Sequence, residues 1–480
     1  MDWNKYLISK RRRDSKVGSF DGKCDDKRNA FESDFGRVIF SPALKRMHDK
    51  TQVIPLTSGD YIHTRLPHSI EVMNIADSIC IDLCRNDEFL KRCNYDDPYL
   101  ESKMSAIVKT AALVHDIGNT PFGHFGEDAI KNFFVGEGKV YLKGLDYRQK
   151  LDFTSFDGNA QGFRILTKLQ YLGDLYGLNL TYATLGAFLK YPNPSKPDKD
   201  SQAYIGDKKH GIFFTEEELF NDIAKECSMI SEKKKGFVRH PLSFIVEAAD
   251  SICYDIMDIE DGIIMKWFSL TDVIKFLNDY IPKHYDRKKV PSIEYFDIKN
   301  LIGFKESASN DKKKVVDFRV KIIQYLVNKV TRIYIDKLED IDKGIFNKEL
   351  LEEDEYKVGE ALLAFAKKEM YTQKDICLSE LTGEAVISKL LKLILSSIFH
   401  EDKNFRNRIK YVMSQSCLRE AIRENYANET LPIDPDGDLF NFDIDALKPY
   451  FKVRMAVDWV SGMTDKYAVE VYQRLSGHSV

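Results

Sequence analysis

Apolar residues recur three and four positions apart along nearly the whole chain, which is the spacing of one face of an α-helix. Alternation of apolar and polar residues, which indicates a half-buried strand, is confined to short stretches near residues 52–55 and 204–214. We therefore predict an all-α fold with at most a small β element. The predicted helices span residues 68–92, 101–117, 125–135, 159–174, 179–190, 216–231, 241–265, 270–281, 314–340, 356–371, 383–399, 403–424 and 450–475.

The 480 residues are enough to bury a large core and to form more than one unit. Loops are predicted at 191–211, which holds three prolines, and at about 283–313, which is rich in Lys, Asp, Ser and Asn. We divide the chain into an N-terminal arm (1–33), a helical core (34–270) and a C-terminal helical region packed on that core (271–480).

Composition excludes several classes of protein. A net charge of -4 argues against a strongly basic nucleic-acid-binding protein. The chain shows neither a signal peptide nor an apolar run long enough for a membrane span, so we expect a cytoplasmic protein without membrane contact. The eight cysteines are scattered without a CxxC pair, which indicates reduced thiols rather than a zinc knuckle or a disulfide framework.

A polar pair stands at the end of one strongly apolar segment. His115 and Asp116 directly follow residues 106–114, and Gly118 comes two residues later. The pattern predicts a buried helix that ends near the glycine. Because burying an unpaired charge is costly, the histidine and the carboxylate need partners there. A metal ion is one such partner and a salt bridge is another.

A second apolar segment, at residues 241–265, carries a polar stripe. Asp250, Tyr254 and Asp258 are four residues apart in turn, so they lie on one face of the predicted helix. A further histidine, His68, follows Pro67, which suits the first turn of a helix. Polar groups therefore accompany three predicted buried helices.

Two imidazoles and two carboxylates can be drawn from these helices: His68, His115, Asp116 and Asp250. Mixed nitrogen and oxygen ligands suit Mn, Fe, Co, Ni or Zn, and they accept Mg together with water. A set without thiolates that leaves open positions is typical of a catalytic metal site rather than a structural one. Taken singly, each histidine is equally compatible with a hydrogen-bonded residue of the core.

Several segments resemble one known family: residues 34–39, 50–53, 65–72, 115–127, 156–162, 247–254 and 458–468. The H…HD…D pattern of the four residues above is similar to that of HD-domain phosphohydrolases. The flanking residues resemble, more narrowly, the bacterial deoxyguanosine triphosphate triphosphohydrolases. Two positions depart from the family, since Pro67 stands where Thr is usual and Asp157 where Glu is usual.

The resemblance implies an HD-domain helical core with an additional C-terminal helical lobe, and hydrolysis of dGTP to deoxyguanosine and intact triphosphate. It implies one divalent metal ion (Mn, Mg or another first-row transition metal), held by His68, His115, Asp116 and Asp250. His124 and Glu127 match the catalytic pair, with His124 as nucleophile or general acid. One helical turn brings these two side chains together, and a carboxylate on one ring nitrogen raises the basicity of the imidazole.

Substrate contacts are also implied by the resemblance. Arg65 and Lys190 match phosphate-binding residues, and Lys208 or Lys209 is a weaker third candidate. The sugar pocket is assigned to Gln52, Asn159, Tyr254 and Asp258. An aromatic ring packed under the ribose C2′ would clash with a 2′-hydroxyl, so Tyr254 is expected to reject ribonucleotides. Val53 is expected to line the base, and Glu380 is a further candidate for base recognition.

Other functions stay open at this point. The chain could hydrolyse several dNTPs, act as a different HD enzyme on a signalling nucleotide or a phosphodiester, or serve as a non-catalytic scaffold that binds single-stranded DNA. Relatives form hexamers and can bind single-stranded DNA, so we expect a homo-oligomer and keep DNA as a partner. Lysine runs at 233–235 and 312–314 would suit a basic groove, although such runs are more often solvated faces.

Overall fold

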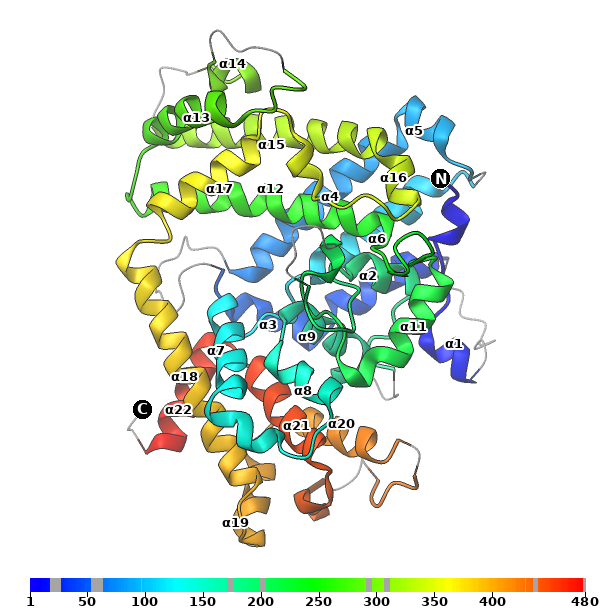
Figure 1. Ribbon diagram of the computed structural model, residues 1–480, viewed down its shortest axis with the longest axis vertical. Coiled ribbons are helices and arrows are strands. Elements are labelled where there is room, and N and C mark those ends of the chain that lie inside the picture. Colours follow the sequence, from blue (N-terminus) through cyan, green and yellow to red (C-terminus); the bar gives the residue numbers. More distant parts are fainter. Residues whose placement is uncertain are drawn as a thin grey trace.

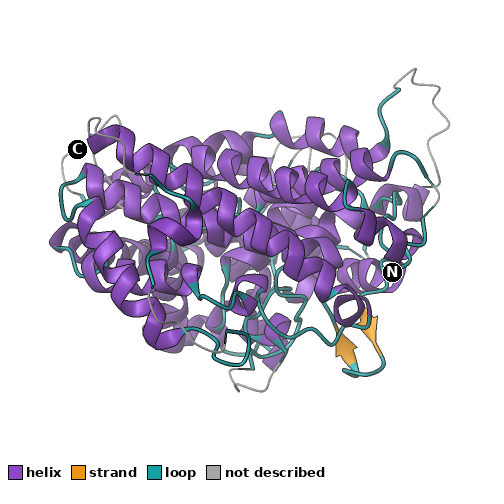
Figure 2. Ribbon diagram, turned by 90° about the horizontal axis from the view of Figure 1, so that it is seen from above, coloured by secondary structure: helices purple, strands orange, loops and turns teal. Residues whose placement is uncertain are grey.

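The structure is a computed structural model that describes residues 1–17, 27–52, 64–95, 97–170, 176–198, 204–290, 296–305, 311–427, 429–434 and 439–477. It confirms the all-α prediction, and its one small sheet within these residues is a two-stranded hairpin (Figure 2). The α-helices and strands are α1 (Arg12–Val17), α2 (Ala30–Ile39), α3 (Pro42–Arg46), α4 (Arg65–Cys84), α5 (Asp87–Arg92), α6 (Leu100–Val114), α7 (His124–Val135), α8 (Tyr147–Thr154), α9 (Gly158–Arg164), α10 (Tyr182–Phe188), α11 (Glu217–Glu226), β1 (Ile230–Ser231), β2 (Gly236–Phe237), α12 (Pro241–Ile264), α13 (Leu270–His284), α14 (Ile298–Ile302), α15 (Asp311–Asp336), α16 (Leu338–Asp342), α17 (Val358–Glu369), α18 (Lys374–Ile398), α19 (Lys403–Asn407), α20 (Gln415–Asn425), α21 (Pro449–Ser461) and α22 (Asp465–Ser476).

The expected β element was placed wrongly. Residues 204–214 form turns and a short 3₁₀ helix, Ile205–Asp207, because their backbone hydrogen bonds are either local, such as Asp207 N–H to Tyr204 O, or isolated, such as Gly211 N–H to Asn193 O, and form no strand ladder. The strands lie instead at 230–237, where β1 pairs antiparallel with β2. The first of them falls inside a segment that periodicity had extended as a helix to residue 231. The other suggested strand, 52–55, lies outside the described residues apart from Gln52.

Periodicity also merged helices that the structure separates. The segment predicted at 450–475 is two helices, α21 and α22, divided by Gly462, Met463 and Thr464. Thr464 begins the second helix, because its side chain accepts a hydrogen bond from the Tyr467 N–H. Apolar residues continue at helical spacing across the interruption, so their spacing alone does not reveal it.

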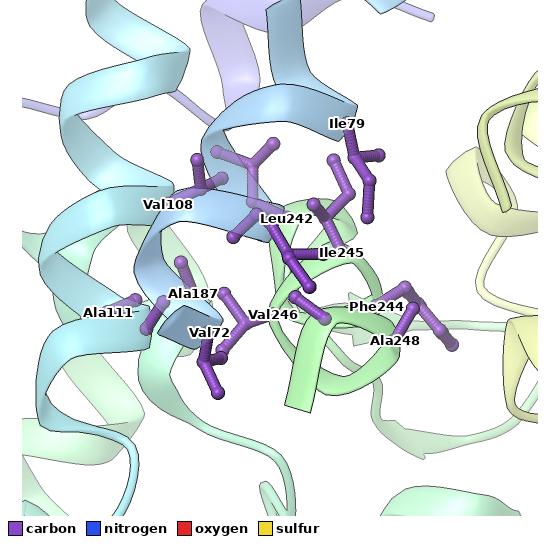
Figure 3. Packing of buried hydrophobic residues seen from close by; sticks show 14 of the residues in the cluster. Val72, Ile79, Val108, Ala111, Ala187, Leu242, Phe244, Ile245, Val246 and Ala248 are labelled. Atoms are coloured by element: carbon purple, nitrogen blue, oxygen red, sulfur yellow. The ribbon is translucent and has the colours of Figure 1, made fainter. Parts of the chain in front are cut away.

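Three helices, α4, α6 and α12, pack against one another and form the centre of the first hydrophobic core. α12 crosses the upper part of the molecule in Figure 1, with α4 beside it. It is buried along most of its length, and its buried residues include acidic side chains, among them Glu247, Asp255 and Asp258, as well as apolar ones. Figure 3 shows how closely small and branched side chains interlock here; the labelled ones are Val72, Ile79, Val108, Ala111, Ala187, Leu242, Phe244, Ile245, Val246 and Ala248.

A second hydrophobic core lies where α7 packs against α18, and α18 in turn packs against α21 and α22 (Figure 1). The first core extends from Trp3 to Phe365 and the second from Phe122 to Val471. Each core therefore draws on residues before and after position 270. The division of the chain into three units stays a prediction.

The turn after α6 lies directly on the start of α9. A methyl group added to Gly118 would come within 2.1 Å of the Gly158 carbonyl oxygen and of the Gly162 nitrogen. Only glycine allows backbones to approach this closely. The contact fixes the segment that carries His115 and Asp116 against α9.

The seven cysteines within the described residues are all free, as the scattered spacing predicted. No helix in the described part of the chain is long and apolar enough to cross a membrane.

Candidate active site

Three of the predicted ligand residues meet at the contact of α4, α6 and α12. His68 comes from α4, His115 follows α6 directly, and Asp250 comes from α12. One potential ligand atom of each lies within 4.8 Å of the others. Asp250 Oδ1 is 3.1 Å from His68 Nε2 and 3.2 Å from His115 Nε2. The cluster thus offers two imidazole nitrogens and a carboxylate oxygen to a single point.

Hydrogen bonds orient both imidazoles toward this point. His115 Nδ1 donates to the Ala112 carbonyl oxygen at 2.7 Å, and His68 Nδ1 faces the Met257 sulfur at 3.2 Å. Both Nε2 atoms are therefore turned to Asp250. His115 Nε2 is buried and makes no hydrogen bond of good geometry to any residue that the structure describes. A metal ligand held through its other ring nitrogen has this arrangement.

The local charges favour a cation in the cluster. Burial acts to lower the pKa of His115, but Asp116 and Asp250 outweigh it and raise the pKa to about 9. Burial acts to raise the pKa of Asp250, but His115 and His68 outweigh it and hold the pKa well below its ordinary value. The two carboxylates therefore stay ionised and attract positive charge to the point that the imidazole nitrogens face.

Asp116 lies at the edge of the cluster rather than inside it. Its Oδ2 pairs with Arg65 Nη1 at 2.5 Å, and its Oδ1 accepts a hydrogen bond from Asn119 Nδ2 at 2.6 Å. The same Oδ1 is 3.5 Å from His115 Nε2. Burial would raise the pKa of Asp116, but Arg65 and His115 lower it to about 2. Its assignment as a fourth ligand stays a prediction.

His124 and Glu127 lie on the first turn of α7, as their spacing predicted. His124 Nδ1 is 3.6 Å from Glu127 Oε2. The histidine side chain is 70% exposed whereas that of Glu127 is 3% exposed. Glu127 Oε1 accepts the Gly158 N–H at 3.2 Å, so the start of α9 holds the carboxylate in place. Glu127 is a buried anchor rather than a solvated residue.

Charge links this pair to a neighbouring lysine. Glu127 raises the pKa of His124 above its ordinary value. Burial acts to raise the pKa of Glu127, but His124 and Lys209 outweigh it and lower the pKa to about 2. Lys209 Nζ also lies 2.8 Å from Asp157 Oδ2. The aspartate that departs from the family pattern is therefore the partner of a candidate phosphate-binding residue.

One cavity of about 580 Å³ brings the cluster, His124 and the cationic side chains together. Its wall includes Arg65, Lys190 and Lys209, whereas Lys208 does not line it. Gln52, Asn159 and Glu380 line it as well. Val53 lies outside the described residues. A ligand in this cavity would meet cations, the His124 ring and the cluster at once.

A hydroxyl network forms the wall on the side of α12. Tyr254 and Tyr371 line the cavity, and the Tyr371 hydroxyl donates to Asp258 Oδ2 at 2.5 Å and lies 2.7 Å from the Tyr254 hydroxyl. Burial raises the pKa of Asp258 to about 7, against the effect of the Tyr371 hydrogen bond. The stripe expected on α12 is thus completed by a residue from the turn before α18.

Tyr371 and Thr51 also line the cavity, although no sequence pattern indicated a role for either. The Arg239–Glu247 pair was not predicted either; the distance from Arg239 Nη2 to Glu247 Oε1 is 3.1 Å, and Lys190 Nζ lies 3.6 Å from the same oxygen. Tyr371 is 113 residues from Asp258 in sequence and lies in the turn between α17 and α18, so no local pattern marked it. Glu247 could have been recognised as a site residue from the sequence, because it is an acidic residue within a strongly apolar segment.

Comparison with known proteins agrees with this geometry. Residues 65–154 match the HD domain family. Over the full length of both chains, the protein is 33% identical to a deoxyguanosinetriphosphate triphosphohydrolase-like protein of Listeria monocytogenes. It is 32% identical to a protein of the same description from Pseudomonas aeruginosa, over 100% of this chain and 99% of the relative. It is 31% identical to a deoxyguanosinetriphosphate triphosphohydrolase of Klebsiella pneumoniae, over 93% of each chain.

The match to the HD domain covers His68, His115, Asp116, His124 and Glu127, and the similarity to the full-length relatives also covers the segments that carry Asp250 and Tyr371. The chain therefore belongs to the deoxyguanosinetriphosphate triphosphohydrolase-like family of HD-domain proteins.

Proposed function

We propose that the protein hydrolyses a deoxynucleoside triphosphate, dGTP by preference, at the α-phosphorus. Water oxygen forms a bond to the phosphorus, the bond from phosphorus to the 5′ oxygen breaks, and the 5′ oxygen leaves with a proton as deoxynucleoside. The inorganic product is intact triphosphate. The observation that carries the proposal is a single cavity lined by the His68–His115–Asp250 cluster, His124 and three cationic side chains.

A divalent metal ion fits the cluster. The buried Nε2 atom of His115 has no hydrogen-bond partner among the residues that the structure describes, and it faces carboxylate oxygens together with His68 Nε2. We assign His68, His115 and Asp250 as ligands, with Asp116 as the fourth. A bound divalent ion supplies Lewis acidity, which polarises a phosphoryl oxygen and lowers the pKa of water. The donor set suits Mn or Mg with water as well as other first-row metals.

We assign proton transfer to His124. Its ring is exposed to the cavity while Glu127 fixes the Nδ1 side and keeps the imidazole basic. The Nε2 atom is then left to give a proton to the departing 5′ oxygen, or to bond to phosphorus as that oxygen leaves, after which water breaks the nitrogen–phosphorus bond and releases triphosphate. Either role requires that the His124–Glu127 pair keeps a fixed position relative to the His68–His115–Asp250 cluster.

The cationic wall suits a triphosphate. Arg65 is 4% exposed, and its guanidinium lies where the cluster and the His124 loop meet. Lys190 follows α10, and Lys209 lies in the segment before α11. Lys190 already forms an ion pair with Glu247, and Lys209 with Asp157. Several converging cations stabilise the phosphate charges and orient the α-phosphorus.

The deoxyribose is assigned to Gln52, Asn159, Tyr254 and Asp258. Gln52 Oε1 is buried without a hydrogen-bond partner among the described residues, so it is available to a sugar hydroxyl. Tyr254 is fixed by its contact with Tyr371, which makes its ring a rigid wall. A rigid ring at this place excludes a 2′-hydroxyl more sharply than a mobile one.

The Tyr254→Ala variant is expected to accept ribonucleotides. We expect the ratio of kcat/KM for GTP to that for dGTP to rise at least about tenfold, because the wall that meets the 2′-hydroxyl is removed. Steady-state kinetics with both nucleotides measures the ratio. Tyr254→Phe, which loses only the hydroxyl contact with Tyr371, should leave the ratio within about threefold of the unaltered protein. An unchanged ratio in Tyr254→Ala would remove Tyr254 from sugar selection.

Hydrolysis of the four dNTPs and GTP, with Mn or Mg present, tests the proposed substrate. Cleavage of dGTP in strong preference supports the specific proposal. Equal cleavage of all four dNTPs supports the mechanism and contradicts the preference. Absence of cleavage with every nucleotide contradicts the proposed function. Cytoplasmic localisation, a homo-oligomer and binding of single-stranded DNA stay predictions.

A further inference from the structure

The C-terminal segment 458–468 resembles the family, but it contributes no residue to the wall of the cavity. Asp465 is the first residue of α22 and is 2% exposed. A buried carboxylate needs partners, so its contacts indicate what the segment does.

Both oxygens of Asp465 bind segments that are remote in sequence. Oδ2 accepts hydrogen bonds from the Thr51 N–H at 2.9 Å and from the Thr51 hydroxyl at 2.5 Å. Oδ1 accepts the Phe122 N–H at 2.9 Å. One carboxylate thus joins the segment before α4 to the loop before α7.

These bonds are not an ordinary helix cap. The cap of α22 is made by Thr464, whose hydroxyl oxygen accepts the Tyr467 N–H. The hydrogen bonds of the Asp465 side chain that the structure describes all come from Thr51 and Phe122. The carboxylate therefore acts on other segments rather than on its own helix.

The Phe122 loop needs such support. Phe122 has φ 62° and Gly123 has φ 60°, so two successive residues adopt the left-handed region immediately before His124. A residue with a side chain rarely adopts this backbone unless its surroundings hold it there. A side chain at Gly123 would come within 2.7 Å of Arg65 Nη2, so the loop also lies against the candidate phosphate-binding arginine.

The Thr51 segment reaches the same place. Thr51 and Gln52 line the cavity. Lys50 joins the same segments as Asp465 does, because its buried Nζ donates to the carbonyl oxygens of Asn119 and Ser461. Its carbonyl oxygen accepts the Arg65 N–H at 3.0 Å. The segment between α21 and α22, with Ser461 and Asp465 at its ends, therefore links three parts of the chain: residues 50–52, the loop at 119–123 and the start of α4.

We propose that Asp465 is a positioning residue that, through Thr51 and Phe122, holds the Gln52 segment and the His124 loop in register around the cavity. The C-terminal helices then serve the reaction although they contribute no residue to the cavity wall. The kinetic consequence rests on the proposed function, whereas the consequence for the loop does not.

The isosteric variant Asp465→Asn tests the proposal, because its amide group presents N–H where an acceptor is needed. We expect kcat for dGTP to fall about 10- to 100-fold, since small displacements of reacting groups have effects of this size. The Kd for Mn²⁺ should stay within about threefold, because the cluster is not altered, and KM should rise by a smaller factor than kcat falls, because Gln52 shifts while the cationic wall is retained. Hydrogen exchange should accelerate at least about tenfold at the Phe122 amide or at the Thr51 amide in Asp465→Asn, because the asparagine keeps one acceptor for two segments, and at the Phe122 amide in Asp465→Ala, which keeps none.

Thr464→Ala is the matched control. It weakens the cap of α22 but leaves the carboxylate of the next residue in place, so it should lower Tm while kcat and exchange at Phe122 stay unchanged. Equal losses in Thr464→Ala would overturn the proposal, because stability of the C-terminal helix would then explain them. If Asp465→Asn changes neither kcat nor hydrogen exchange, the deciding variant is Asp465→Ala, because alanine removes both acceptor oxygens.

Unchanged kcat together with unchanged exchange at Phe122 in Asp465→Ala overturns the proposal, as does a lower kcat without faster exchange. If the unaltered protein cleaves no nucleotide, the proposed function fails. Hydrogen exchange at Phe122 then still decides whether Asp465 holds the loop.

Discussion

Replacing Asp250 with alanine is expected to abolish tight binding of Mn²⁺ and, with it, hydrolysis. The carboxylate is the group that faces both imidazoles, at 3.1 Å from His68 Nε2 and 3.2 Å from His115 Nε2. Loss of even an outer partner of a metal ligand weakens affinity about 10- to 100-fold, so loss of this ligand should weaken it at least about 100-fold. Isothermal titration with Mn²⁺ measures the affinity directly.

A second readout does not depend on activity. A ligand that binds only the folded protein stabilises it by about 2.7 kcal/mol at a concentration of 100 times Kd. Mn²⁺ should therefore raise the Tm of the unaltered protein but not that of Asp250→Ala. The control is Asp128→Ala, which removes a 63% exposed carboxylate paired with Lys131 on α7. Normal Mn²⁺ affinity in Asp250→Ala would show that the metal binds elsewhere.

The His124→Ala variant is expected to separate catalysis from metal binding. General acid–base catalysis contributes about 10²- to 10⁴-fold, so kcat should fall by that amount. His124 does not belong to the His68–His115–Asp250 cluster, and its side chain is 70% exposed, so Mn²⁺ affinity and Tm should change little. Steady-state kinetics and Mn²⁺ titration of the same preparation provide the comparison.

Glu127→Gln and His284→Ala sharpen this test. Glu127→Gln removes the charge that keeps His124 basic, so it should reproduce part of the loss in kcat. His284 is an exposed histidine on α13 whose Nδ1 contacts the Tyr280 carbonyl oxygen, and it does not line the cavity. His284→Ala should retain full activity. A His124→Ala protein that hydrolyses dGTP at the normal rate would exclude His124 from the reaction.

The sequence predicted where the candidate site residues lie wherever a local pattern carried the information. The apolar runs before His115 and around Asp250 showed that polar groups would be buried, and the structure brings both residues together with His68. The spacing of His124 and Glu127 correctly placed them on one helical turn. Four-residue spacing also placed Tyr254 and Asp258 on the same face, where both contact Tyr371.

Long-range contacts were beyond a local pattern. Tyr371 and Asp465 contact residues more than 100 positions away in sequence. The spacing of apolar residues predicts only which face of a helix is buried, not which distant residue that face contacts. The misplaced strand has a related cause. Alternation at 204–214 suggested extended backbone, but Gly206 lies in a 3₁₀ helix and the Gly211 N–H donates to the Asn193 carbonyl oxygen outside any strand. Asp116 was expected in the ligand cluster, and its pairing with Arg65 could not be read from spacing.

The most direct test of the proposed reaction is the identity of the products formed from dGTP and Mn²⁺ in ¹⁸O-labelled water, separated by anion-exchange chromatography. Attack at the α-phosphorus predicts deoxyguanosine without label and intact triphosphate that carries one ¹⁸O atom. Formation of dGMP with pyrophosphate, or of dGDP with orthophosphate, would contradict the account, because a different phosphorus–oxygen bond would then be broken.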